Sequence, residues 1–312
     1  MKSLLSVIFS LLAFHLVIAH PGIGIVKDSK GNIFYTDLQQ VWKISPGGKK
    51  TIAVHNVHTH ELYMDANDDL YGEHNWYNGE RLNTWGSYAW CLRSNGKLDT
   101  VVAIKEGFLE NYSFVRDAEG NQYWAEGFKR IQKKTPDGKI STISEGKFKD
   151  IRWMHATANG SLYFIDQLGL YEIDKAGKVQ LIAKDVSKPP GADLRSQRHS
   201  TFGIWLDKEQ NIYVAIFSQK AVKKISPGGT ITDFIHSQTP WAPTGGLFDD
   251  EGNLWLMECN TQNEIRVRTV NQKELKAFPS KATISNQALT ITAAIAIILL
   301  IGFGTKKLMQ KR

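Results

Sequence analysis

A short stretch of this chain combines imidazole and carboxylate side chains that could bind a metal ion. His58 and His60 alternate in the sequence and are followed by Glu61, so an extended backbone would place both imidazoles on one side. Histidine and carboxylate groups are common zinc ligands, and carboxylates also bind calcium. With His199, the two histidines are our candidate ligands for one divalent ion, zinc or calcium. In the alternative interpretation, these histidines face solvent or cap turns.

Two glutamates are candidates for acid–base catalysis. Glu126 and Glu258 each come three residues after an aromatic residue, Tyr123 and Trp255 respectively. A positioned pair of carboxyl groups can donate and accept protons during hydrolysis or elimination. Acids at the same position elsewhere, such as Asp37, are expected to cap loops. That structural role is also the alternative for the two glutamates.

A wider set of aromatic and charged side chains is predicted to bind a ligand. Aromatic rings beside acids and cations can hold a sugar or another polar molecule by stacking and hydrogen bonding. In the alternative interpretation, the tryptophans only pack down the long loop that carries them. The candidate ligand-binding residues are Glu61, Glu73, His74, Trp76, Trp85, Glu110, Asn111, Arg195, Arg198 and Trp241.

The elements that position these residues follow from a repeated pattern, Asp-x-x-Gly-Asn-apolar-aromatic. Its polar part suits a tight hairpin turn, because Gly and Asn tolerate positive φ. Alternating apolar runs flank each turn, and every unit reads as four short antiparallel strands. The spacing of roughly 40 residues is typical of β-propeller blades. The copies cover residues 28–34, 65–71, 117–123, 157–163, 207–213 and 249–255.

We therefore predict an all-β fold, a six-bladed β-propeller with four antiparallel strands in each blade. The last two strands of blade six are expected at 264–269 and 274–278. An open β-solenoid is the alternative. In a propeller the first strand of each blade lines the central channel and starts on the top face, where the second strand ends. The candidate residues, and insertions at 75–88 and 186–198, are therefore expected around one channel mouth.

The repeat resembles NHL repeats and the senescence marker protein/gluconolactonase propellers across nearly the whole chain between its two ends. For the gluconolactonase-like enzymes, the resemblance implies one divalent ion held at the channel mouth by a Glu, an Asn and an Asp. This chain has His20 near the position of the Glu and Thr244 at that of the Asp. Since threonine cannot replace the carboxylate, the departures weaken the expectation of lactonase activity.

The two ends predict export and membrane anchoring. Residues 1–19 resemble a secretory signal peptide, with an uncleaved N-terminal anchor as the alternative. Residues 20–279 would form the propeller and 280–287 a polar linker. Residues 288–305 are uncharged and apolar, which favours a single transmembrane helix over a buried or interfacial one. The basic tail 306–312 would be cytoplasmic. The propeller would then lie on the periplasmic or extracellular side.

The basic charge of the chain is concentrated in its ends. The sequence has 38 basic and 31 acidic residues, but Lys2 and the four cations of the tail lie outside residues 20–305. The remaining part is close to neutral and gives no support to nucleic-acid binding. The two cysteines, Cys91 and Cys259, fall in blades that are not neighbours and are expected to stay unpaired.

These observations predict a monomeric, membrane-anchored extracytoplasmic propeller that binds a small polar molecule or a glycan at its top face. In the catalytic form of this prediction the protein is a divalent-metal-dependent hydrolase or lyase, because a bound cation can stabilise a developing oxyanion. The alternative is a non-catalytic interaction module of the NHL type, which presents one face to a protein or glycan.

Overall fold

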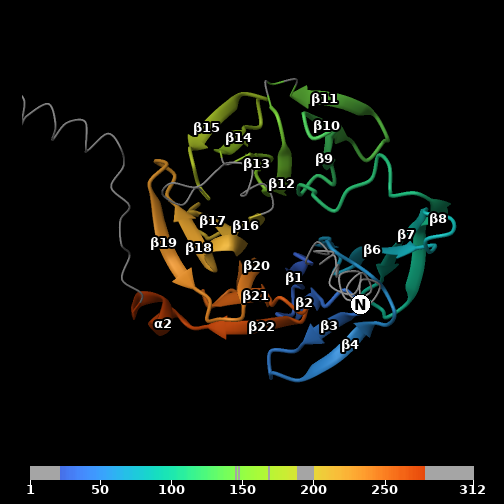
Figure 1. The fold of residues 1–312 in the computed structure, drawn as a ribbon, viewed down its shortest axis with the longest axis horizontal. Coiled ribbons are helices and arrows are strands. Elements are labelled where there is room, and N and C mark those ends of the chain that lie inside the picture. The colour runs from blue at the N-terminus through green and yellow to red at the C-terminus, as the bar shows by residue number, and fades with distance from the viewer. Residues whose placement is uncertain (1–21, 145, 147, 168, 188–199, 278–312) are drawn as a thin grey trace, which may run out of the picture.

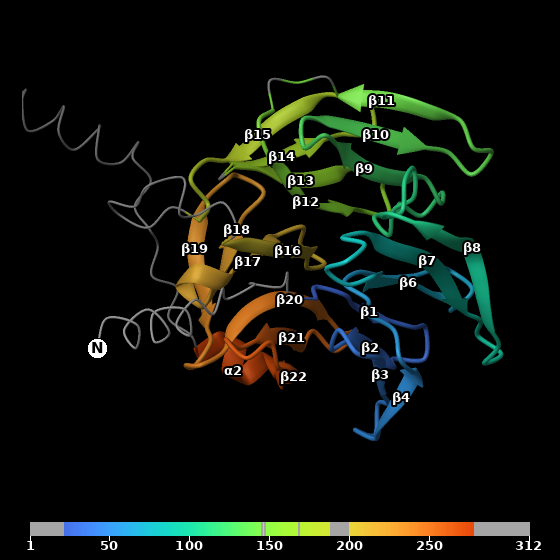
Figure 2. The ribbon, with the colours of Figure 1, turned by 45° about the vertical axis from the view of Figure 1, so that its right-hand side comes forward.

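The computed structural model describes residues 22–144, 146, 148–167, 169–187 and 200–277. Six antiparallel sheets are arranged around a central channel (Figure 1). In the turned view the first strands face the central space and the last strands lie on the rim (Figure 2). The predicted six-bladed β-propeller is confirmed.

The first three blades follow one another along the chain. Blade one contains β1 (Ile25–Lys27), β2 (Ile33–Thr36), β3 (Val41–Ile44) and β4 (Lys50–Val54). Blade two contains β5 (Leu62–Met64), β6 (Leu70–Tyr77), β7 (Trp85–Leu92) and β8 (Leu98–Glu106). Blade three contains β9 (Gln122–Glu126), β10 (Arg130–Lys134) and β11 (Ile140–Ser144).

The last three blades complete the ring. Blade four contains β12 (Ile151–Ala156), β13 (Leu162–Asp166), β14 (Gly169–Ile173) and β15 (Val179–Ala183). Blade five contains β16 (Thr201–Leu206), β17 (Ile212–Ile216), the 3-10 turn η2 (Phe217–Gln219), β18 (Ala221–Ile225) and β19 (Ile231–His236). Blade six contains β20 (Ala242–Phe248), β21 (Leu254–Cys259) and β22 (Ile265–Val270), followed by the helix α2 (Gln272–Ala277).

The prediction of four strands in every blade is wrong for two blades within the described residues. In blade three the place of the first strand holds an isolated bridge between Arg116 and Gln122. In blade six α2 replaces the strand expected at 274–278, of which residue 278 is not described. The cause is local, because Asn271 and Glu274 form a capping box, with Glu274 N donating to Asn271 Oδ1 at 2.9 Å and Asn271 N to Glu274 Oε2 at 3.2 Å. Leu275 packs on a core cluster.

The repeated residues fasten the turn between the first and second strands. In blade three, Asp117 Oδ1 accepts hydrogen bonds from the backbone N–H groups of Glu119 and Asn121, both at 3.0 Å. Its Oδ2 accepts from Asn121 Nδ2 and from the Tyr123 hydroxyl, both at 2.7 Å. Gly120 has a φ of +80°, which glycine adopts without strain. The pattern therefore has a structural role.

Apolar clusters fill the spaces between neighbouring blades. One cluster joins blades four and five through Ile165, Leu170, Val214 and Ile216, which are fully buried. Burial of such side chains is the main contribution that holds the sheets together. Cys91 and Cys259 are both buried and unpaired, as predicted.

Several predicted segments lie outside the described residues. They are the signal peptide 1–19, the linker 280–287, the transmembrane helix 288–305 and the tail 306–312. Among the residues that are described, none belongs to a helix with the length and apolar character needed to span a membrane.

Candidate functional site

A central channel runs between the blades. Its cavity has a volume of about 440 Å³ and is lined by residues of β1, β5, β12, β16 and β20 and by segment 114–116 of blade three. His155 lies on its wall, and burial lowers the pKa of its imidazole to about 4. The first strands therefore occupy the channel wall, as the register of the repeat predicted.

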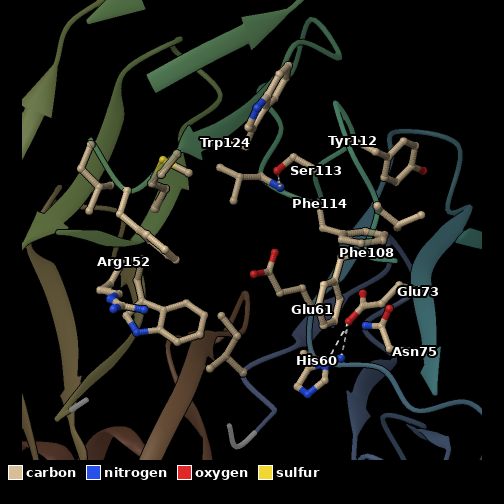
Figure 3. A pocket seen from close by; sticks show the side chains of 18 residues that line it. His60, Glu61, Glu73, Asn75, Phe108, Tyr112, Ser113, Phe114, Trp124 and Arg152 are labelled. Atoms are coloured by element: carbon tan, nitrogen blue, oxygen red, sulfur yellow. Dashed lines mark hydrogen bonds and ion pairs between the residues drawn. The ribbon is translucent and has the colours of Figure 1, made fainter. Parts of the chain in front are cut away.

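A second cavity opens beside this channel between blades two, three and four. Its volume is about 520 Å³, and we call it the mouth cavity. Figure 3 shows its wall of side chains. It shares six lining residues with the channel, so the two spaces are contiguous; they are Ile23, Glu61, Phe114, Val115, Trp153 and Met154.

The irregular start of blade three makes room for the mouth cavity. Segment 108–115 crosses the wall without a regular first strand. It is held by side-chain and backbone bonds: Ser113 N donates to Gln122 Oε1 at 3.1 Å, and Tyr123 N donates to the carbonyl of Val115 at 3.0 Å. The aromatic residues of this segment that line the mouth cavity are Phe108, Tyr112 and Phe114.

An aromatic band continues from the cavity onto the hairpin of blade two. Phe108 stacks on Trp85, with ring centroids 5.5 Å apart, and Trp85 lies 5.2 Å from the ring of Tyr77. The insertion predicted at 75–88 extends β6 and β7 as paired strands, with Tyr77 opposite Trp85. Trp85 is 39% exposed and Phe108 57% exposed, so the band is open to a ligand.

Two carboxyl groups lie on one wall of the mouth cavity. Glu73 Oε1 accepts a hydrogen bond from His60 N at 2.6 Å and is 3.3 Å from His60 Nδ1. Glu73 Oε2 is buried and has no hydrogen-bond partner among the described residues, and the side chain is only 7% exposed. A buried carboxylate oxygen without a donor is costly, and because Glu73 lines the cavity, a ligand there could supply the donor.

Glu61 lies beside this group, immediately before β5. Its carboxyl group points into the cavity in Figure 3, and it lines both the mouth cavity and the channel. Burial, followed by the charge of Glu73, raises the pKa of Glu61 to about 7, against the opposing effect of His60. A carboxyl group with this pKa can give or take a proton near neutral pH.

The main cation across the cavity is Arg152 (Figure 3). Its Nε is 2.9 Å from Asp150 Oδ1, an ion pair without the alignment of a hydrogen bond, and its guanidinium lies over the ring of Phe128 at 4.5 Å. Asp150 therefore balances its positive charge, and the charge offered by the cavity wall comes from Glu61 and Glu73.

Two of the predicted histidine ligands, His58 and His60, are described, and both contact groups of blades one and two. His58 Nδ1 is 2.8 Å from the carbonyl of Leu38, so this nitrogen donates, and His58 N donates to His74 Nδ1 at 2.8 Å. Burial lowers the pKa of both His58 and His74. The rings of His58 and His60 contact each other at 4.7 Å.

Across the described ranges, no three His, Cys, Asp or Glu side chains gather as a metal site. His199 lies outside those ranges, and so do Arg195 and Arg198. The divalent ion stays a prediction. Thr244 stands where the gluconolactonase-like pattern has its metal-binding Asp. It is buried, and its hydroxyl lies 3.5 Å from the carbonyl of Met257.

The two glutamates predicted to be catalytic lie outside both cavities. Glu126 is half exposed, forms an ion pair with Arg130 at 2.7 Å and accepts from Gln132 Nε2 at 2.9 Å. Glu258 is fully buried, and its Oε2 accepts from Nε of both Arg266 at 2.9 Å and Arg268 at 3.1 Å. These contacts give both residues structural partners on neighbouring strands.

The other candidate ligand-binding residues are spread around the face. Trp76 and His74 stack at 5.4 Å on the side of the hairpin away from Tyr77 and Trp85. Trp241 lies under Arg266 at 4.2 Å. Glu110 is exposed, 3.6 Å from Lys105, and Asn111 accepts from Lys134 through its carbonyl. Of the predicted site residues that the structure describes, only Glu61, Glu73 and His60 line the mouth cavity.

Sequence reasoning missed most of the cavity wall. The missed aromatic and polar lining residues include Phe108, Tyr112, Ser113, Phe114, Trp124, Phe128 and Trp153. One usable signal was the density of aromatic residues in 108–114, directly before the blade that departs from the strand pattern. Trp124 and Trp153 are on β9 and β12, where the repeat alone does not show which side chains reach a cavity.

No protein-family model matches the sequence, and no curated protein matches it significantly. Solved structures share the fold. An auxiliary nutrient binding protein from Bacteroides thetaiotaomicron aligns with TM-score 0.57 and 10% identity over 80% of this chain and 69% of that chain. The gluconolactonase XC5397 from Xanthomonas campestris aligns with TM-score 0.52 and 11% identity over 81% and 87%.

Virginiamycin B lyase from Staphylococcus aureus aligns with TM-score 0.49 and 18% identity over 82% of this chain and 86% of that chain. At these identities the similarity concerns the fold. The resemblance of the repeat to gluconolactonase-like propellers is thus confirmed as a resemblance of architecture.

Proposed function

We propose that this protein binds a small polar molecule or a glycan in the mouth cavity of its propeller. The observation that carries the proposal is a 520 Å³ cavity lined by aromatic rings and by Glu73, whose buried Oε2 has no hydrogen-bond partner in the described part of the chain. Pockets of this size and lining are typical of small-molecule sites.

A bound ligand could contact the unpaired oxygen of Glu73 and the aromatic rings that line the cavity. A donor on the ligand would complete the hydrogen bonding of Glu73, and its apolar surface would stack on Trp124 or Phe108. The fold is shared with propellers described as auxiliary nutrient binding proteins, which is consistent with a binding role.

The proposal includes a location for the monomeric protein. Residues 1–19 direct export, residues 288–305 anchor the chain in a membrane, and the near-neutral segment 20–279 stands on the outer side. The linker 280–287 gives the propeller room above the membrane surface. The mouth cavity would then be accessible to molecules outside the cytoplasm.

A catalytic role is the second candidate. Two carboxyl groups on one wall of a cavity, Glu61 and Glu73, favour it, because such a pair can move a proton during hydrolysis or elimination. If a zinc or calcium ion is bound as well, it would supply charge stabilisation. Elemental analysis of the full chain, purified without a chelator or a His tag, tests for that ion.

The binding proposal is tested by measuring thermal shifts of the full chain in detergent with a panel of sugars, amino acids, organic amines and organic acids. A compound that binds in the mouth cavity should stabilise the protein, and Trp124→Ala should remove that shift. Trp42→Ala, in blade one, makes the same change away from the cavity and should preserve it. If no compound shifts the protein, or if Trp124→Ala leaves every shift intact, the proposal is wrong.

A further inference from the structure

We propose that the ligand of the mouth cavity carries a positive charge, such as an ammonium group, that sits against Glu61 and Glu73, and a flat apolar body that lies between the aromatic walls. This inference rests on the binding function proposed above.

The charge balance of the lining favours a cation. Glu61 has no hydrogen bond or ion pair with another described residue, while its carboxyl group faces the cavity. The positive charge of Arg152 is matched by Asp150. His60 is the other basic group of the lining, and it is already beside Glu73 Oε1. His60 is thus the one basic side chain of the lining available to two carboxyl groups. A cationic ligand would supply the missing positive charge.

The unpaired oxygen of Glu73 gives the ligand a defined contact. Glu73 Oε1 is fixed by His60 N, so Oε2 has a set orientation on the wall. The side chain is more than nine-tenths buried, and the contact would be shielded from solvent. An N–H donor with a positive charge makes a stronger bond to a carboxylate than a neutral donor makes.

The rings around the two acids suit the same ligand. Tyr112, Phe114 and Trp124 line the cavity, and aromatic rings attract cations through their quadrupole. They also offer flat apolar surface for the rest of the ligand. An anionic ligand would meet the carboxyl groups, and a neutral one would leave their repulsion uncompensated.

The test compares three probes of similar size on the full chain in detergent: 2-phenylethylamine, 2-phenylethanol and 3-phenylpropanoate. Affinities are measured by calorimetry and by tryptophan fluorescence at pH 8, where Glu61 is mostly ionised. The amine should bind at least about tenfold more tightly than the alcohol, and the acid should bind least. High salt should weaken the amine more than the alcohol.

Two glutamine variants test where the charge sits. Glu61→Gln and Glu73→Gln keep the size of the side chain, and each should reduce the amine-to-alcohol affinity ratio severalfold. Glu119→Gln, in the turn at the opposite end of blade three, should leave the ratio unchanged. Because Glu73 contacts the backbone of His60, Glu61→Gln provides a second test if Glu73→Gln fails to fold.

The outcomes separate this inference from the proposed function. Equal affinity for amine and alcohol, or a ratio that both glutamine variants preserve, overturns the cationic ligand and leaves small-molecule binding intact. Failure of all three probes to bind also overturns it. The proposed function falls only if the wider compound panel gives no shift that depends on Trp124.

Discussion

At the scale of single residues, two buried glutamates of this propeller differ in their surroundings. Glu258 is fully buried, and Arg266 and Arg268 both pair with its Oε2, while its Oε1 has no hydrogen-bond partner among the described residues. Glu73 is nearly as buried and keeps one oxygen without a donor among the described residues. Glu73 lines the mouth cavity whereas Glu258 lies outside both cavities, and this difference in surroundings, more than burial itself, separates the candidate binding acid from the structural acid.

His155 on the channel wall should make stability depend on pH. Burial lowers the pKa of its imidazole from 6.5 to about 4. Between pH 6.5 and pH 4 this histidine is therefore mostly protonated in the unfolded chain and mostly neutral in the folded chain. Stability from neutral His155 is therefore complete above pH 6.5 and is lost as pH falls to 4, by roughly 3 kcal/mol at most.

His155→Gln should flatten this part of the pH profile, as measured by thermal unfolding at pH 7, 5.5 and 4. His236→Gln changes an exposed histidine on β19 and serves as the matched control. If His155→Gln shows the same loss between pH 6.5 and 4 as the unchanged protein, then His155 is not held neutral by burial.

At the scale of elements, the turn between the first and second strands of a blade is fixed by the side chain of its aspartate. Asp249 accepts from Asn253 N at 2.7 Å, from Asn253 Nδ2 at 3.0 Å and from Trp255 Nε1 at 3.0 Å. These bonds join the turn to the second strand. The same arrangement at Asp117 and Asp207 explains why the residue types recur.

Asp249→Ala should lower the free energy of unfolding by about 2–4 kcal/mol, because it leaves several donors without an acceptor. The adjacent Asp250 is exposed and forms a single surface ion pair with Lys27, and Asp250→Ala should leave the melting temperature nearly unchanged. Thermal unfolding of the two variants checks the difference. Equal effects would show that the turn aspartate is not the structural residue we infer.

The strands that follow the repeated pattern could be predicted from the sequence. The irregular start of blade three and the helix α2, which depart from the pattern, could not. The repeat predicts Glu61 and Glu73 at the channel mouth, because their positions can be counted from the repeated turn. Segment 108–115 has no such reference, because blade three lacks its regular first strand. For α2, the capping pair Asn271 and Glu274 outweighed the periodic expectation of a strand.

Register also predicts which face a residue lies on but not which side chain it will meet. Glu126 and Glu258 were expected beside the channel mouth from their position after the aromatic residue. Their partners, Arg130 for Glu126 and Arg266 and Arg268 for Glu258, come from the neighbouring strand. Cross-strand contacts of this kind depend on pairing that the repeat does not encode.

At the scale of the whole molecule, the six blades enclose a channel and leave one side of its mouth open between blades two and four. The open side is the one where blade three is irregular. The architecture is shared with binding and catalytic propellers alike, so the fold by itself does not decide between these functions.

Membrane topology is testable on whole cells or spheroplasts. An epitope placed after Arg312 should survive protease added from outside, while the propeller should be degraded, because residues 288–305 are proposed to cross the membrane with the basic tail inside. Loss of the epitope without permeabilisation, or full protection of the propeller, would contradict the proposed orientation.

The central claim is that the mouth cavity is the binding site. A crystal structure of the protein with the tightest-binding compound of the panel tests it most directly. We expect the ligand to lie between Trp124 and the wall formed by Glu61 and Glu73, with a donor on Glu73 Oε2. A ligand bound elsewhere on the propeller, with the mouth cavity empty, would contradict it.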